Sequence, residues 1–349
     1  TSDRSLGRSR MLLTDTARPS LPRRSGRRVI ALGVVGMFAA GACSSDTDDA
    51  TAAEERSQDA VTELVAQVAS YELVADRDQR FIVGMFSNDD GVVSFGTARL
   101  DFDYLGTEAD PLDEPRPGPS TTASFLPIPG SAETSEGGGA RFTSPSEARG
   151  VYGAESVRFD APGFWEVEVT IELDGAEKRA SAAFEVGDEQ HVPVVGDPAP
   201  KTDNLLPGDP DAPVTAIDSR ADDDGSVPDP ELHQVTIDAA IAAGKPVMVV
   251  VSTPVFCVSQ FCGPITDTVQ QLAQDTGDEM AFVHLEVWRD FENNAINRAA
   301  AEWIWPDQSG DPGEPWVFVV DAAGTIVQRW DNVVTERDLE TAIQTVLED

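Results

Sequence analysis

The feature that most constrains the fold of this 349-residue chain is a change in hydrophobic patterning along the sequence. From about residue 60 to residue 186 apolar and polar residues alternate, most clearly over residues 164–174, and this period of two indicates half-buried β-strands. From residue 231 onward, short apolar runs alternate with helix-like segments. Two such regions in one chain favour two domains, an all-β domain followed by an α/β domain.

The first region is predicted to form a small β-sandwich over residues 60–187. Its short alternating segments are separated by turns such as Asn-Asp-Asp-Gly at 88–91, as expected for antiparallel strands. The Pro-Gly-Phe-Trp segment at 162–165 leads into a long predicted strand, and it resembles an edge of the immunoglobulin-like modules of bacterial envelope proteins. This domain is predicted to act either as a spacer or as a binding domain for a ligand or partner.

The second region is predicted to form an α/β domain over residues 231–349. It follows a Pro- and Asp-rich stretch, residues 188–230, which we interpret as a linker and an extended entry segment. Thr335 is the expected N-cap of the last helix, with Asp338 three residues later. The expected elements are helices at 231–243, 264–275, 292–304 and 335–347 and strands at 246–252, 280–287, 316–321 and 325–331.

Residues 1–42 have the organisation of a secretory signal. Four arginines between positions 23 and 28 precede an apolar run at 29–42 that is too short to span a bilayer comfortably. The run ends in Ala-Gly-Ala directly before Cys43, which resembles a lipobox. That resemblance implies lipid modification of Cys43 and anchoring at the extracytoplasmic face of the cell membrane; a plain cleaved signal is the alternative. Residues 43–59 are acidic and lack an apolar pattern, so we interpret them as the lipid anchor and a solvated tether.

The charge balance of the chain excludes one large class of functions. The formal net charge is −37. Binding to nucleic acid requires a Lys/Arg surface that can neutralise phosphates, and an acidic surface would repel them. We therefore expect no nucleic-acid partner.

The two cysteines after Cys43 carry the most specific chemistry in the sequence. Outside the cytoplasm, thiols five positions apart such as those of Cys257 and Cys262 are expected to oxidise. The Cys-Gly-Pro sequence that begins at Cys262 lies where a strand gives way to a helix, and it resembles the first three residues of the thioredoxin Cys-Gly-Pro-Cys motif. The resemblance implies that Cys262 is the nucleophile, because a helix N-terminus stabilises a thiolate. Ile265 replaces the second cysteine of the motif, which leaves Cys257 as the partner.

The resemblance to thioredoxin-like proteins extends over roughly residues 195–349. Val-Gly-Asp-Pro-Ala-Pro at 195–200 resembles the opening of peroxiredoxins and of membrane-anchored thioredoxins of the TlpA type. Pro315 matches the cis-proline that faces the cysteines in this family. The match implies that the backbone beside Pro315 pairs with an extended substrate, while Trp316 packs in the core or lines the groove. The acid that thioredoxins carry in the strand before the active site is absent, and Glu286 is the suggested substitute.

The predicted function is that of a membrane-anchored thiol–disulfide oxidoreductase that acts on protein thiols or disulfides. Cys262 is expected to react first, and Cys257 is expected to resolve the mixed disulfide. The alternative is a non-catalytic envelope binding or scaffold lipoprotein, in which the disulfide only contributes about 2–3 kcal/mol of stability. A peroxidase fits less well, because Thr253 stands four residues before Cys257 rather than three.

Histidine-based sites receive little support from the sequence. A copper site formed by the two cysteines and His284 is a further alternative, whereas His191 and His233 lie in or beside the linker and are assigned no role. The sequence contains no zinc-binding cluster, P-loop or Ser/His/Asp pattern. Neither a metal nor another cofactor is therefore expected.

Overall fold

The computed structural model describes residues 64–132, 138–210, 212–222, 224–259, 261–306 and 313–348. The predicted signal segment, Cys43 and the acidic tether lie outside these residues. No helix among the described residues is long and apolar enough to cross a membrane. All of the described residues belong to one compact unit.

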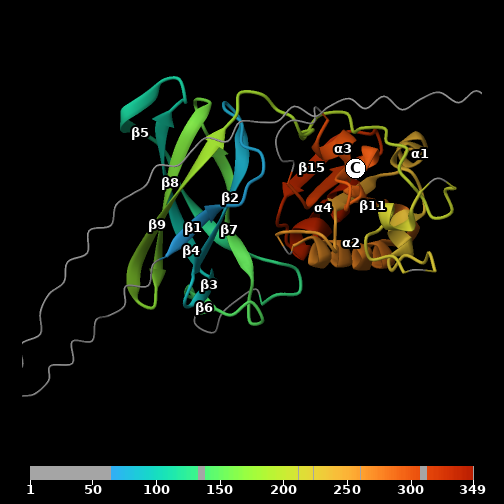
Figure 1. The fold of residues 1–349 in the computed structure, drawn as a ribbon, viewed down its shortest axis with the longest axis horizontal. Helices are drawn as coiled ribbons and strands as arrows, with labels where there is room; N and C mark the ends of the chain where they lie inside the picture. The colour runs from blue at the N-terminus through green and yellow to red at the C-terminus, as the bar shows by residue number, and fades with distance from the viewer. Residues whose placement is uncertain are drawn as a thin grey trace, which may run out of the picture. The chain divides into compact units, whose positions relative to one another are not determined.

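The first half of the described chain forms a nine-stranded antiparallel sheet (Figure 1). The strand order is β6-β3-β2-β7-β5-β4-β8-β9, and β1 pairs with β2 beside this path. The strands are β1 (Val65–Val68), β2 (Asp78–Ser87), β3 (Gly91–Ser94), β4 (Thr97–Gly106), β5 (Pro111–Pro127), β6 (Arg141–Thr143), β7 (Gly150–Arg158), β8 (Gly163–Leu173) and β9 (Ala176–Val186).

Strand β8 confirms the period-two pattern that the sequence predicted. Trp165, Val167 and Val169 are fully buried, and Ile171 and Leu173 are each 2% exposed. The residues between them are partly or fully exposed. Because successive side chains of a strand point to opposite faces, this alternation places one face of β8 in the core of the sheet.

The β-sheet differs from the predicted sandwich in one respect: its strands form one continuous sheet, not two separate ones. The long strand β5 is the cause. Its first part pairs with β4, and its last residues, Ser124 to Pro127, pair with β7. Phe81 of β2 contacts Phe102 of β4 edge-on, with ring centroids 4.9 Å apart, so strands from both halves of the sheet share one core.

The second half of the chain contains a four-stranded sheet of order β11-β10-β14-β15. β10 is parallel to β11 and antiparallel to β14, which is in turn antiparallel to β15. All four strands lie within one or two residues of the predicted positions: β10 (Val247–Ser252), β11 (Ala281–Glu286), β14 (Trp316–Val320) and β15 (Ile326–Asp331). β10, β11 and β14 are buried along their whole length, as is typical of strands covered on both faces.

Helices cover both faces of this sheet (Figure 1). Val247, Val249 and Val251 of β10 pack in a cluster with the first and third helices, whereas Met248 and Val250 pack with the second and fourth. The helices are α1 (Ile237–Ala242), α2 (Cys262–Thr276), α3 (Arg298–Ile304) and α4 (Glu336–Glu348). The predicted N-cap of α4 is confirmed, because the Asp338 amide donates a 3.2 Å hydrogen bond to the Thr335 hydroxyl.

Two predicted helices are shorter than expected. The helix predicted at 292–304 begins only at Arg298, because the preceding residues form a two-stranded hairpin of β12 (Trp288–Asp290) and β13 (Ala295–Ile296). Asn294, with φ +53°, occupies the left-handed conformation in this hairpin. The helix predicted at 231–243 is divided into a 3-10 turn and α1. The short 3-10 helices are η1 (Val214–Ala216), η2 (Pro230–His233) and η3 (Gly277–Glu279).

Candidate functional site: a disulfide between β10 and α2

Cys257 and Cys262 form a disulfide bond in the segment that joins β10 to α2. Their Cα atoms are 6.1 Å apart. Cys262 is the first residue of α2, so the sequence correctly placed it at a helix start, and Pro264 is the third residue of that helix rather than the first. A proline is tolerated there because the first-turn amides have no partner within the helix.

The two cysteines differ in their access to solvent. Cys262 is completely buried, whereas Cys257 is half-buried. The sequence predicted that Cys262 reacts first, whereas in the disulfide-bonded chain Cys257 is the sulfur that solvent reaches. The partial positive charge at the N-terminus of α2 still favours a thiolate at Cys262. Cys257 is therefore the accessible sulfur, and Cys262 is the better placed leaving thiolate.

Glu314 and Pro315 lie beside the disulfide. The Glu314–Pro315 peptide bond is cis, and Pro315 is buried directly before β14. A carboxylate oxygen of Glu314 and the Sγ atoms of Cys257 and Cys262 all lie within 4.8 Å of one another. Glu314 is half-buried, so its carboxylate is a candidate acceptor for a thiol proton.

Two hydroxyl groups contact the Glu314 backbone. The Ser259 hydroxyl lies 3.3 Å from the Glu314 carbonyl oxygen and 3.2 Å from the Cys257 sulfur. The Tyr71 hydroxyl also donates a hydrogen bond to this carbonyl. The sequence predicted that the backbone beside Pro315 pairs with an extended substrate. In the structure the Glu314 carbonyl of this backbone already has hydrogen-bond partners within the chain.

Trp316 occupies a core position. It is 2% exposed and stacks on Phe318, with ring centroids 5.8 Å apart and the planes tilted by 13°. Of the two roles considered for this residue, packing in the core is the one that its burial supports.

Apolar side chains are exposed around the half-buried cysteine. Val255 is 53% exposed, Val258 is 93% exposed and Phe291 is 42% exposed. The Phe291 ring stacks on Phe256, the neighbour of Cys257, with centroids 4.0 Å apart. Several exposed apolar side chains in one place are typical of a surface that contacts another molecule.

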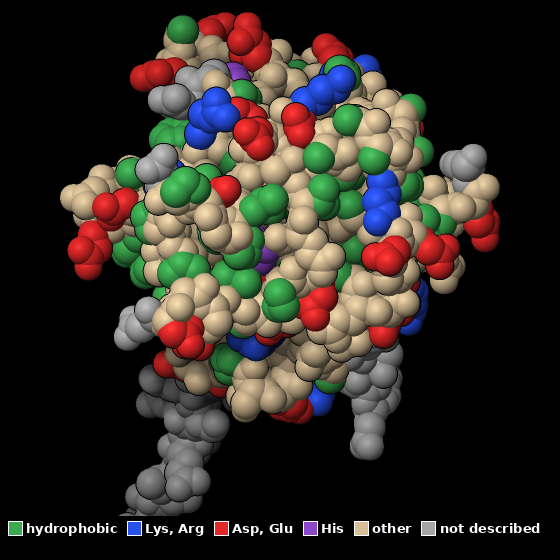
Figure 2. Space-filling model, turned by 90° about the vertical axis from the view of Figure 1, so that its right-hand side faces the viewer, with side chains coloured by type: hydrophobic (Ala, Val, Ile, Leu, Met, Phe, Trp, Pro, Cys, Tyr) green, Lys and Arg blue, Asp and Glu red, His purple; other side chains and the backbone are tan. Residues whose placement is uncertain are grey.

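One face of the molecule is mixed in charge. Figure 2 shows acidic side chains spread over one face of the molecule, with Lys and Arg side chains between them. The face shown in Figure 2 carries no continuous basic area.

Neither of the other residues suggested from the sequence lies in this disulfide cluster. Glu286 is buried and accepts hydrogen bonds from the amides of Ser219 (2.9 Å) and Trp288 (3.1 Å). Burial raises the pKa of Glu286. His284 belongs to a separate group of ionisable side chains, so within the described residues the structure does not bring it together with the cysteines as a copper site would require.

The chain matches no protein-family model and no curated protein. Its site is therefore defined by geometry alone: an accessible sulfur at Cys257, a buried sulfur at Cys262 and a carboxylate at Glu314. Sequence reasoning found both cysteines but missed Glu314. The signal in the sequence that could have identified Glu314 is its position immediately before Pro315, a residue that was already assigned to the site.

Proposed function

We propose that this protein is a membrane-anchored, extracytoplasmic thiol–disulfide oxidoreductase with a thioredoxin-like C-terminal domain. The observation that carries the proposal is the disulfide itself, in which accessible Cys257 is bonded to buried Cys262 at the start of α2. The mixed sheet, the helices on both faces and Pro315 beside the cysteines support the family resemblance. Lipidation of Cys43 and the spacer or binding role of the β-sheet domain belong to the same proposal.

The proposed reaction begins with attack by a substrate thiolate on Sγ of Cys257. The Cys257–Cys262 bond breaks, its electron pair passes to Sγ of Cys262, and a mixed disulfide joins the substrate to Cys257. A second substrate thiolate then attacks the substrate sulfur of that bond, and Cys257 leaves as a thiolate. The substrate dithiol is thereby oxidised to a disulfide, while both cysteines of the protein are reduced and take up the two protons. The reverse sequence reduces a substrate disulfide.

Glu314 is proposed to move the proton in these steps. Its carboxylate oxygen lies within 4.8 Å of both sulfurs, so it can accept a proton from an incoming thiol, directly or through one water molecule. The Ser259 hydroxyl, 3.2 Å from Sγ of Cys257, is placed to donate a hydrogen bond to a thiolate there. These two side chains replace the acid that thioredoxins carry in the preceding strand.

The proposed partners are proteins with accessible cysteines. Val255, Val258 and Phe291 present apolar side chains near Cys257, and a protein segment can bury them on contact. An exposed cysteine within an apolar stretch of a secreted protein therefore fits the site better than a small hydrophilic thiol does.

Single cysteine variants test the proposal. In Cys262→Ser the accessible Cys257 thiol attacks a substrate disulfide, and the mixed disulfide persists because the resolving thiol is missing. In Cys257→Ser the remaining thiol is buried and should form mixed disulfides at least about tenfold more slowly. Both reduced variants are incubated with a peptide disulfide, and covalent adducts are measured by non-reducing gel and mass spectrometry. Rapid adduct formation by Cys257→Ser and none by Cys262→Ser would overturn the assigned roles.

The reduction potential of the wild-type pair separates catalysis from a structural bridge. Structural disulfides of secreted proteins usually have potentials below about −300 mV, so we expect a less negative value for Cys257–Cys262. A potential below that value, together with no adduct in either variant, would favour a binding or scaffold lipoprotein whose disulfide is structural.

A further inference from the structure

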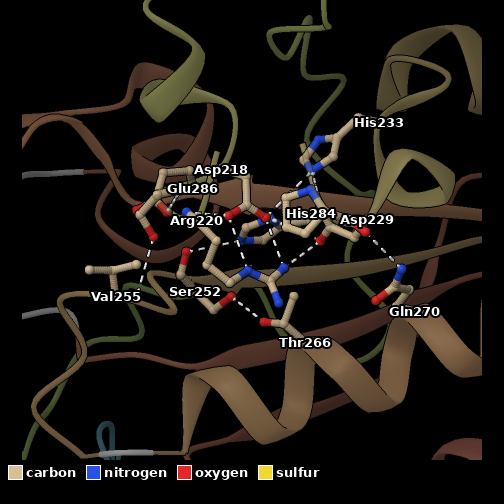
Figure 3. A network of polar contacts seen from close by, with 12 residues as sticks. Asp218, Arg220, Asp229, His233, Ser252, Val255, Thr266, Gln270, His284 and Glu286 are labelled. Atoms are coloured by element: carbon tan, nitrogen blue, oxygen red, sulfur yellow. Dashed lines mark hydrogen bonds and ion pairs between the residues drawn. The ribbon is translucent and has the colours of Figure 1, made fainter. Parts of the chain in front are cut away.

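A second group of ionisable side chains is buried in the same half of the chain (Figure 3). Asp218 lies just after η1, Asp229 directly precedes η2, His233 ends η2, and His284 lies within β11. All four side chains are completely buried. Burying two carboxylates and two imidazoles together is costly unless they are paired or bind a cation.

The spacing of the four side chains matches a small coordination site. Nδ1 of His284 lies 3.4 Å from Asp218 Oδ2 and 3.9 Å from Asp229 Oδ2. Nε2 of His233 lies 3.2 Å from Asp229 Oδ1 and 4.0 Å from Asp218 Oδ2. One possible ligand atom from each residue lies within 4.8 Å of all the others. Tetrahedral bonds of about 2.0–2.1 Å place neighbouring ligand atoms about 3.3–3.4 Å apart. The separations of 3.2 and 3.4 Å match this spacing, and those of 3.9 and 4.0 Å would have to shorten around a zinc ion.

The orientation of the His284 ring gives an independent indication. Its Nε2 lies 3.2 Å from the Ser252 carbonyl oxygen, which can only accept, so Nε2 carries a hydrogen. In a neutral ring Nδ1 then presents a lone pair toward the Asp218 carboxylate. In this neutral form the buried Nδ1 makes no hydrogen bond among the described residues, whereas a second proton on the ring would form an ion pair with Asp218 Oδ2, 3.4 Å away. A cation between Nδ1 and the carboxylate removes this repulsion, and histidine ligands commonly donate their other N–H to a backbone carbonyl.

The carboxylates of the cluster also outnumber the guanidinium that neutralises them. The Arg220 guanidinium donates hydrogen bonds from Nη2 to Asp218 (2.8 Å) and Asp229 (2.7 Å), and from Nη1 to Asp267 (2.7 Å). One guanidinium thus faces two buried carboxylates and a third at the surface, which leaves an excess of negative charge. Each carboxylate oxygen has two lone pairs, so an oxygen that accepts from Arg220 can still bind a metal ion.

We propose that Asp218, Asp229, His233 and His284 bind one divalent transition-metal ion, with zinc as the best match to two imidazoles and two carboxylates at tetrahedral spacing. Four protein ligands complete the coordination of such an ion, so the site is structural. It fixes the segment before α1, which supplies three ligands, against β11, which supplies the fourth. The alternative to a metal ion is a second proton on His284. In that case the four side chains form an ion-paired cluster without metal.

Zinc binding to the full chain tests the site directly. The oxidised protein is stripped with a chelator, dialysed, and titrated with zinc chloride at pH 8, where an ordinary imidazole is neutral; calorimetry and elemental analysis give the stoichiometry. We expect one zinc per chain and a higher melting temperature after zinc is added. Failure of the wild-type chain to bind stoichiometric zinc, or binding without any change in melting temperature, would overturn the proposal in favour of the protonated cluster.

Three variants locate the bound ion. His284→Gln should weaken zinc binding by more than about tenfold, which is the lower end of the effect of losing even an outer-shell partner. His191→Gln, a histidine outside the cluster, should bind like the wild type. The Cys257→Ser/Cys262→Ser double variant should also retain binding. Loss of zinc from the cysteine variant, or unchanged binding by a folded His284→Gln chain, would place the metal elsewhere and refute the assignment. If His284→Gln does not fold, the wild-type and cysteine-variant titrations still decide.

Discussion

Replacing Glu314 by Gln should make the Cys257–Cys262 disulfide easier to reduce. Reduction creates a thiolate within 4.8 Å of the Glu314 carboxylate, and two like charges at that distance repel each other. Coulomb's law gives about 0.9 kcal/mol at a dielectric constant of about 80 and about 3.5 kcal/mol at about 20, the range for a half-buried pair. Since about 1.4 kcal/mol corresponds to about 30 mV for two electrons, Glu314→Gln should raise the reduction potential by about 20–75 mV.

The pH dependence of this shift makes the test specific. The repulsion exists only when a thiolate is present, so the full shift is expected at pH 9, above the ordinary thiol pKa of about 8.5, and little of it at pH 6. Potentials are measured by equilibrating each protein with a dithiol buffer and counting free thiols by mass spectrometry after alkylation. Glu172→Gln, at an exposed position of β8, is the matched control and should leave the potential unchanged. A Glu314→Gln potential equal to or more negative than that of the wild type at pH 9 would refute the electrostatic reasoning.

Two further variants test the packing of buried polar groups. Tyr152→Phe removes the 2.7 Å hydrogen bond to the Phe95 carbonyl and should cost about 1–3 kcal/mol of unfolding free energy. Burial raises the pKa of Tyr152, so its stabilising contribution is complete below about pH 10 and is lost as pH rises further; the variant should lack this alkaline decline in urea melts. Arg220→Ala removes the guanidinium that neutralises the buried carboxylates of Asp218 and Asp229 and leaves them only the two imidazoles, so it should lower the unfolding free energy in chelator by about 3–5 kcal/mol. A loss below about 1 kcal/mol for either variant would contradict its stated contacts.

Local patterns predicted most of the secondary structure in the second half of the chain. The strand predicted at 246–252 is β10, and the helix predicted at 264–275 is α2, extended by two residues at its start and one at its end. These predictions succeeded because the buried residues of both elements form an apolar pattern that can be read from the local sequence. The pattern failed over residues 292–297, where strand β13, flanked by Asn294 and the N-cap Asn297, precedes α3. Asparagine is tolerated both in the left-handed conformation and at a helix N-cap, and apolar periodicity predicts neither of these positions.

The continuous β-sheet could not be predicted from strand patterns. The first eight residues of β5 are all exposed and its sequence has five prolines, so no alternation marks this strand, and alternation elsewhere does not show which strands lie beside each other. The switch of β5 from β4 to β7 at Ser124 is a matter of register between segments far apart in the sequence. A sandwich and one continuous sheet therefore have the same local signature.

The functional residues were recognised only where they are close in sequence. Cys257 and Cys262 form a readable motif, whereas Glu314 reaches the sulfurs only through the pairing of β14 with β10. The cluster formed by Asp218, Asp229, His233 and His284 was missed for the same reason. His233 was set aside because it lies beside linker sequence, although its side chain is as fully buried as that of His284.

The two proposed sites meet at the end of β10. The Ser252 carbonyl accepts from Nε2 of His284, and the carbonyl of the next residue, Thr253, accepts from the Cys257 amide at 3.0 Å. The Ser252 hydroxyl also contacts the Thr266 hydroxyl of α2 at 2.7 Å. The last residue of β10 and the residue directly after it thus hold the imidazole cluster and the loop of the accessible cysteine. Parallel pairing of β10 with β11 creates this neighbourhood, because it brings His284 opposite Val250, two residues before the strand ends.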